Sequence, residues 1–571
     1  MFHPNGGARV TMIDILTQED LMLPLQNSES LIIKVEVLDS KTQNVIGSIK
    51  GLVSGNVSIN GESDVRHTCN LVIQPNMLEK IKLEEGNLVW LDKDIRFSIG
   101  MWNWKLQDYI YYSFGNYVYT DTSSTYDQTT NQLTVNCSDY MVKLDGTKNG
   151  QLGALIISYP AYEENPDTGE PITYNIIRNA VIETLEKLAR ITNHRIDDIG
   201  EYKAMPEYNP DWEKYREENV NIWNTIPFDQ EFSCGCSVLS ILTTFRDLYP
   251  NYEMYFDMDT NTFICQLKPM CYEDDIFIDN NYLQRVLISE SSSTDMTTVR
   301  NICEVWGQTF ENDFYSEEVS YSNNIYSCTI EGYEEGYYNG DVIGLKIPQD
   351  NNASASININ NFGAIGIYDE SDETPISANK MKANTVYTFK VKKKRIEGND
   401  DIRIYLLGEW QAHAINVLTD GTVSNETVTD SEGKEFVLYS KEYFQHFYNC
   451  ERVDFQIVPD SPFTIQKIGE ILDVKTGNEF ENITSDDLAA DRAKWENWKN
   501  CRLTDNISIT TKFLPWLYVN KKVSYRSYAS GELHQYIITS ISHDLTNLTS
   551  SITMYRFYPL YDMTEGEYEN T

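Results

Sequence analysis

The sequence is short of basic residues. It has 46 Lys and Arg against 86 Asp and Glu in 571 residues, which gives a net charge of −40. A protein that grips nucleic acid needs a clustered basic face, because its affinity comes from neutralising phosphates. The best basic cluster is Lys390, Lys392, Lys393, Lys394 and Arg395, and acidic residues follow it closely. The composition therefore excludes a DNA-gripping protein.

Cysteines and long apolar runs are also scarce. The ten cysteines are scattered, which is too sparse for a disulfide scaffold and fits reduced thiols. No apolar run approaches the roughly 18 residues that span a bilayer. The longest, Leu152 to Pro160, predicts one buried strand. Residues 1–26 contain no basic segment leading into an apolar stretch, so no secretion signal is visible and we expect no membrane span.

What the sequence does contain is mostly β pattern. The 41% hydrophobic content is ample for folded cores, and the length favours three or four domains. Apolar and polar residues alternate along 33–37, 56–60 and 95–99, which is typical of antiparallel strands with one polar face. Two further runs, Gln535 to Ser542 and Ser551 to Tyr558, predict a hairpin. The expected fold class is mainly β with a few helices: multidomain β-barrels or β-sandwiches with an α+β middle domain.

Three amphipathic helices are predicted, and each is expected to pack on a sheet. One follows Pro171, is capped by Thr173 and runs to Leu188. The second runs from Val238 to Leu248 before Pro250, and the third begins near Thr484. Composition shifts along the chain suggest a domain map. Its parts are an N-terminal segment 1–27, a tube-like β-barrel 28–115, an α+β domain 116–300, a second barrel from 301–330 plus 466–571, and an inserted β-sandwich 331–465.

Catalytic and metal motifs are nearly absent. No phosphate-binding loop, dinucleotide fingerprint, zincin helix or nucleophile elbow occurs. Asp257, Asp259 and Asn261 resemble the start of a calcium loop, but Thr262 replaces the turn glycine, so a polar hairpin turn is the better interpretation. The pairs His67–Cys69 and Cys234–Cys236 lack zinc-ligand spacing, and His413 and His543 lie among strand residues. We therefore expect no catalytic residue, metal or cofactor.

Three stretches resemble phage tail proteins of the baseplate-hub, or tail-tip, class. They cover both ends of the chain and much of its body: Gly55 to Val72 with Trp90 to Gly100, Tyr117 to Leu152, and Phe513 to Tyr561. The insert, including Gly344 to Asp369 and Tyr405 to Ile415, resembles small β modules carried by many phage tail proteins.

The resemblance implies a homotrimer with two tube-like barrels per subunit, giving a ring of six that joins a trimeric tip to a sixfold tail tube. It implies contacts with distal-tail, tape-measure and other tail-tip or receptor-binding proteins, assembly in the bacterial cytoplasm, and a place in the virion. Many such hubs continue into a peptidase or lysozyme domain. No such extension follows here before Thr571, so we expect a structural protein and not an enzyme. Three copies would carry about −120 in all, and we expect acidic residues to line the lumen so that phage DNA passes without specific binding.

Two alternatives remain open at this stage. The insert either decorates the particle or contacts a host surface glycan, for which Tyr405 and Trp410 offer a stacking platform. The whole chain could instead be a secreted or virion-borne glycan-binding adhesin or polysaccharide-degrading enzyme. The missing secretion signal, the absence of a β-helix repeat and the hub resemblance at both ends argue against that second class.

Overall fold

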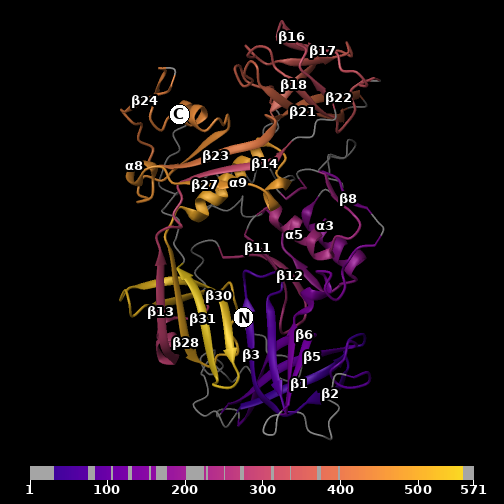
Figure 1. The fold of residues 1–571 in the computed structure, drawn as a ribbon, viewed down its shortest axis with the longest axis vertical. Helices are drawn as coiled ribbons and strands as arrows, with labels where there is room; N and C mark the ends of the chain where they lie inside the picture. The colour runs from indigo at the N-terminus through magenta and orange to yellow at the C-terminus, as the bar shows by residue number, and fades with distance from the viewer. Residues whose placement is uncertain are drawn as a thin grey trace. The chain divides into compact units, whose positions relative to one another are not determined.

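The computed structural model describes 15 stretches of the chain. The chain divides into two compact units. The described residues are 31–74, 84–103, 107–126, 131–153, 156–161, 176–200, 224–226, 229–249, 251–269, 276–309, 314–334, 336–369, 374–396, 399–431 and 433–556. Unit 1 contains residues 1–162, 173–295 and 504–559; unit 2 contains the rest. Six sheets and a few helices make up the described residues, which confirms the mainly β fold class (Figure 1).

Unit 1 is dominated by a sheet of 12 strands. Eleven lie in the order β13-β28-β31-β30-β3-β4-β7-β6-β5-β1-β2, and β29 pairs with β30. The N-terminal strands of this sheet are β1 Leu31–Asp39, β2 Val45–Ile49, β3 Leu52–Asn60, β4 His67–Ile73, β5 Lys93–Asn103, β6 Asp108–Tyr126 and β7 Asn131–Ser138. The others are β13 Leu287–Asp295, β28 Thr504–Lys512, β29 Lys522–Arg526, β30 Leu533–Asp544 and β31 Thr549–Arg556.

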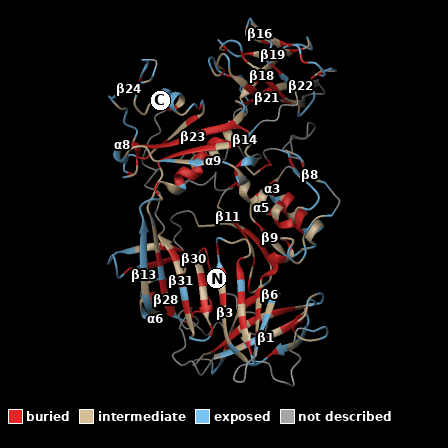
Figure 2. Cartoon of the chain, viewed as in Figure 1, coloured by how far each residue is buried: buried red, intermediate tan, exposed pale blue. Residues whose placement is uncertain are grey.

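One pairing joins the two ends of the chain in this sheet. Strand β3 pairs antiparallel with β30, so that Val57 lies opposite His543 and Ile59 opposite Ile541. Figure 1 shows the indigo N-terminal strands and the yellow C-terminal strands meeting here. The alternating pattern seen in the sequence is real, because in Figure 2 these strands alternate between buried and less buried segments.

The large sheet covers two separate hydrophobic cores. The first lies within β1 to β7 and includes Phe97, Phe114 and Tyr117, all fully buried. The second lies within β28 to β31 and the chain around them, and it includes Trp516 and Tyr525. Each half of the sheet therefore has a hydrophobic core cluster of its own.

The rest of unit 1 is a small α+β region. Its strands are β8 Ile157–Tyr159 paired with β10 Gln230–Phe232, and β11 Tyr252–Phe256, β12 Phe263–Leu267 and β9 His194–Ile196 in a second sheet. Its helices are η2 Tyr140–Lys143, α3 Ile177–Glu183 followed by the π-helix η4 Thr184–Ala189, α5 Val238–Leu248 and α6 Asn280–Val286. Helix α5 has the predicted bounds. Only residues 157–159 of the predicted strand Leu152 to Pro160 are strand, and the predicted cap Thr173 lies outside the described residues.

Unit 2 contains two larger sheets. An eight-stranded sheet has the order β15-β18-β21-β22-β20-β19-β17-β16. Its strands are β15 Phe314–Ser316, β16 Val319–Ser322, β17 Ile325–Cys328, β18 Val342–Lys346, β19 Ser356–Ile359, β20 Ile365–Asp369, β21 Val386–Ile396 and β22 Asn399–Gly408. The four-stranded sheet has the order β26-β23-β14-β27, from β14 Ile302–Thr309, β23 Gln411–Thr419, β26 Val453–Ile457 and β27 Leu472–Lys475.

Helix α9 packs on the four-stranded sheet and is the third predicted helix. It runs Asp486–Asn500, and its cap is Ser485, whose side chain accepts a hydrogen bond from the backbone N–H of Leu488, so Thr484 lies just outside it. Ala489, Ala490 and Ala493 face Cys303 and Val305 of β14 in one core cluster. The remaining elements of unit 2 are β24 Thr427–Thr429, β25 Glu435–Val437, α7 Lys441–Phe447, α8 Ile465–Ile468 and η6 Asn478–Asn482.

The predicted C-terminal hairpin is also confirmed. Strands β30 and β31 pair antiparallel, from Asp544 opposite Thr549 to Tyr536 opposite Arg556. Among the described residues, no helix has the length and apolar character needed to cross a membrane.

Candidate functional site

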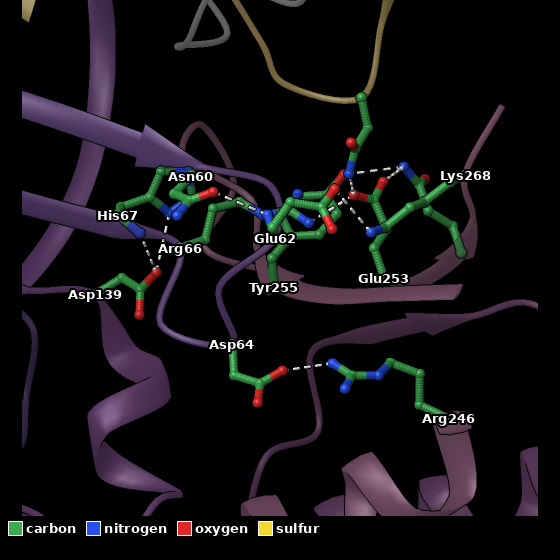
Figure 3. A network of polar contacts seen from close by, with 12 residues as sticks. Asn60, Glu62, Asp64, Arg66, His67, Asp139, Arg246, Glu253, Tyr255 and Lys268 are labelled. Carbon is green, nitrogen blue, oxygen red and sulfur yellow. Dashed lines mark hydrogen bonds and ion pairs between the residues drawn. The ribbon is translucent and has the colours of Figure 1, made fainter. Parts of the chain in front are cut away.

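The turn between β3 and β4 anchors the most connected polar network of unit 1 (Figure 3). Arg66, at the end of the turn, is 4% exposed, and its Nη2 lies 2.5 Å from Oε2 of Glu253 on β11. The same guanidinium lies 4.0 Å from the ring centroid of Tyr255. A buried charge is tolerated only when it is paired and hydrogen-bonded. Here Nη2 meets both conditions, whereas the buried Nε has no hydrogen-bond partner among the described residues.

Glu253 accepts hydrogen bonds from three other segments of unit 1, of which the first is the turn that carries Arg66. Its Oε1 accepts a hydrogen bond of 2.6 Å from Nε2 of Gln266 on β12, and its Oε2 also accepts one from Nδ2 of Asn520. Gln266 in turn accepts a 2.5 Å hydrogen bond from Nη2 of Arg195. One carboxylate thus ties the β3–β4 turn, the β11–β12 hairpin and the chain before β29 together.

Further ion pairs surround this network. Nη1 of Arg246 on α5 lies 2.5 Å from Oδ1 of Asp64, and Nζ of Lys268 lies 3.5 Å from Oε1 of Glu62. Behind them, Oδ2 of Asp139 accepts a 2.8 Å hydrogen bond from the backbone N–H of His67 and lies 3.1 Å from its Nδ1. These contacts fasten the turn to the α+β region.

His543 packs against the first core of the large sheet, to which Phe114 and Phe513 belong. It is fully buried, its ring is 5.1 Å from that of Phe114 and 5.4 Å from that of Phe513, and its Nδ1 is 2.9 Å from Oγ of Ser550. Its Nε2 has no hydrogen-bond partner among the described residues. Burial lowers the pKa of this imidazole to about 3, so it is neutral and serves as a packing residue.

The predicted glycan contacts, Tyr405 and Trp410, differ sharply in exposure. Tyr405 on β22 is 1% exposed and Lys392 lies over its ring, so it offers no free face to a sugar. Trp410, between β22 and β23, is 51% exposed. Of the two residues, therefore, only Trp410 is placed where a sugar could stack, and its glycan contact stays a prediction.

Trp410 borders a cluster of aromatic and ionisable residues in unit 2. Its ring lies 6.3 Å from that of Trp306, which stacks on His413 at 3.5 Å. His413 is buried, and its Nε2 lies 2.8 Å from Oε1 of Glu304. The histidine expected to be an ordinary strand residue is therefore held by a carboxylate and an indole.

Two carboxyl groups beside this cluster have raised pKa values. Burial raises the pKa of Asp486 to about 8, although its Oδ1 accepts a 2.9 Å hydrogen bond from the backbone N–H of His413. Burial, and then repulsion from Glu451, raises the pKa of Glu409 to about 7. At neutral pH, Asp486 therefore favours the neutral form and Glu409 is about half protonated.

The weak metal motifs do not assemble into sites. Asp257 to Asn261 form the predicted turn between β11 and β12, where Oδ1 of Asp257 accepts hydrogen bonds from the backbone N–H groups of Asp259 and Thr260. Within the described ranges, no three His, Cys, Asp or Glu side chains gather as a metal site would require. The cysteines of these ranges are free thiols, and Cys69, Cys234 and Cys236 are among them.

Comparisons with known proteins give a partial family match and several remote structures. Residues 460–561 match the model of a domain of unknown function, DUF5048. No curated protein matches the chain. A tail protein from Neisseria meningitidis MC58 aligns over 93% of this chain and 98% of its own, with 7% identity and a TM-score of 0.40.

Two prophage proteins align in a similar way. The 43 kDa tail protein of prophage MuSo2 from Shewanella oneidensis aligns over 92% of this chain and 98% of its own, with 10% identity and a TM-score of 0.41. Prophage tail protein gp18 from Listeria monocytogenes EGD-e aligns over 91% of this chain and 94% of its own, with 9% identity and a TM-score of 0.38. These TM-scores do not establish a common fold. The names agree with the class, phage tail proteins, that the sequence resembles.

Proposed function

We propose that this chain is a structural component of a bacteriophage tail, located at the tail tip or baseplate hub. Copies of it form a ring that closes the tail tube and lets DNA through at ejection. The observation that carries the proposal is the pair of separate cores beneath one continuous sheet of unit 1. A subunit with two barrel-like halves is what the resemblance to hub proteins implies.

The symmetry of the proposed ring explains why two barrel-like halves per subunit matter. A trimer in which each subunit supplies two barrel-like halves presents six similar units around its axis. Such a ring matches a sixfold tube on one side and a trimeric tip on the other. The direct pairing of β3 with β30 supports the proposal, because it fixes the two halves of one subunit to each other through backbone hydrogen bonds.

The proposed partners follow from this position. The chain would bind two further copies of itself, distal-tail and tape-measure proteins, and other tail-tip or receptor-binding proteins, in the virion after assembly in the bacterial cytoplasm. It would meet phage DNA only in transit. The buried network around Glu253 supports a structural role, because both oxygens of this carboxylate accept hydrogen bonds from other protein groups.

The test is the mass of the purified full-length protein by size-exclusion chromatography with light scattering. We expect about three times the 65.9 kDa of one chain, or a ring-compatible multiple of that. A mass of one chain at every concentration, together with absence of the protein from purified particles, would contradict the proposal.

A second candidate function rests on Trp410 alone. Its exposed indole beside Trp306 could stack on a sugar ring, as in a glycan-binding adhesin or a polysaccharide-degrading enzyme. Incubation with host surface polysaccharide separates these alternatives. Release of reducing ends supports the enzyme, binding without release supports the adhesin, and neither result is expected for a purely structural protein.

A further inference from the structure

One face of the large sheet in unit 1 is polar but almost free of charge. The register places one row of Ser and Thr residues across seven neighbouring strands, β13, β28, β31, β30, β3, β4 and β7. In that order the row is Ser289, Thr510, Ser551, Ser542, Ser58, Thr68 and Ser138. A second row crosses five of these strands through Ser291, Ser508, Thr553, Ser540 and Asn60. We call these two rows the hydroxyl face.

The opposite side of the same strands is apolar. Val57, Cys69, Ile509, Ile541 and Ile552 alternate with the hydroxyl face and are buried in the cores. The side chains of the hydroxyl face are half-buried or exposed, and Thr68, Ser508 and Ser551 are exposed. Strand alternation therefore turns the hydroxyl face away from the cores.

Charge is sparse on this face, although the chain carries −40 in all. The two rows contain neither a cation nor a carboxylate. Lys512, Asp544 and Asp121 lie in the next row, and beyond Ser138 the first row continues through Val118 to the buried Asp94. The net charge thus resides elsewhere on the chain.

Many polar groups of this region bond to their neighbours on the sheet. Nδ2 of Asn56 donates to Oγ of Ser542 at 2.9 Å, and Oγ of Ser58 donates to Oδ1 of Asn56 at 2.8 Å. Oγ of Ser508 lies 3.3 Å from Oγ1 of Thr553. Side chains satisfied in this way have fewer donors and acceptors left to hold a passing ligand.

From these observations we propose that the hydroxyl face lines the DNA path of the tail ring and contacts double-stranded DNA in transit. The proposal rests on the ring function proposed above. DNA is held by cations that neutralise its phosphates, and the hydroxyl face has none. It also lacks the carboxylates of the acidic wall that the net charge alone suggested. Water-exposed hydroxyls allow close approach of the polyanion without strong attraction or repulsion.

The experiment places lysines on the hydroxyl face in assembled particles. The face variant combines Thr68→Lys, Ser508→Lys and Ser551→Lys, at three exposed positions where a lysine can reach water. The matched control combines Ser320→Lys, Ser354→Lys and Thr427→Lys, at three exposed hydroxyl positions of unit 2. DNA release, triggered by envelopes of the host cells, is followed with a DNA-binding dye, and the protein in the particles is quantified by mass spectrometry.

We expect the face variant to be incorporated normally and to release DNA on the order of tenfold more slowly, because each lysine adds a phosphate contact along the path. The control should release DNA at the wild-type rate. Equal release rates in both variants overturn the proposal. The proposal is also overturned if neither the face variant nor the corresponding triple Asp variant is incorporated into particles. In that case the hydroxyl face is covered by another protein. Absence of the wild-type chain from particles contradicts the ring function itself.

Discussion

The two compact units bury ionisable side chains of opposite kinds. In unit 1, the fully buried His543 packs against Phe114 and Phe513, and burial lowers its pKa to about 3. In unit 2, Asp486 lies half-buried at the start of α9, and desolvation raises its pKa to about 8. Burial disfavours the charged form in both units, yet one group must stay deprotonated and the other protonated. The same physical cause therefore gives the two units opposite responses to pH.

Arg66 and Glu253 form a buried ion pair in unit 1. Replacing Arg66 by Met would leave Glu253 buried without its cation, so we expect Arg66→Met to lower the free energy of unfolding by about 3–5 kcal/mol. Urea denaturation measures this change. The double variant Arg66→Met with Glu253→Met removes both charges and should recover a large part of the loss. A loss below about 1 kcal/mol in Arg66→Met would contradict the assignment of a buried pair.

Acid should weaken unit 1 through His543. Its folded pKa of about 3 lies below the ordinary 6.5, so the unfolded state binds a proton first as the pH falls. The stabilisation is present above about pH 6.5 and is lost progressively toward pH 3. Hydrogen exchange of peptides from β30 and β31 measures it, and His543→Gln should remove this part of the pH dependence. His534→Gln, on the same strand but less buried and beside Glu532, is the matched control and should keep it.

Rising pH should weaken unit 2 through Asp486. Its folded pKa of about 8 lies above the ordinary 3.8, so the stabilisation is present at low pH and is lost as the pH rises through 8. Asp486→Asn keeps an acceptor for the backbone N–H of His413 but does not titrate. Thermal unfolding of this variant should lose the decline between pH 4 and 8. If the exposed Asp460→Asn variant removes the decline equally well, the assignment to Asp486 is wrong.

The smallest change in the free energy of unfolding is expected from a substitution of Trp410. Because half of its surface is exposed, Trp410→Ala should alter the free energy of unfolding by no more than about 0.5 kcal/mol. If the insert binds a host glycan, the same substitution should abolish binding measured by calorimetry, while Tyr528→Ala at an exposed site of unit 1 leaves it intact. Retained binding in Trp410→Ala would remove this residue from the glycan proposal.

Local features of this fold could be predicted from the sequence, and long-range ones could not. Helix α5, the β30–β31 hairpin and the turn at Asp257 follow from periodicity and turn residues over a few positions. The pairing of β3 with β30 joins residues almost 500 positions apart, and local pattern does not set such a register. The hydroxyl face depends on that register, so it could not be seen in the sequence.

In the candidate site, too, local features could be predicted from the sequence and long-range contacts could not. Arg66 and Glu253 stand 187 positions apart, and nothing in the sequence near either one indicates the other. His543 could have been placed in the core, because it alternates with Ile541 and Leu545 on the apolar side of its strand. Tyr405 lies in strand β22. Whether its ring is covered depends on how the sheet packs, and the local sequence does not determine that packing.

The most direct test of the account is an electron cryomicroscopy reconstruction of the tail tip in particles that contain this chain. The account predicts three copies around the tube axis, six barrel-like halves in one ring, and Ser542 and Thr68 facing the channel. A reconstruction with the chain outside the ring, or with the hydroxyl face pointing away from the channel, would contradict it.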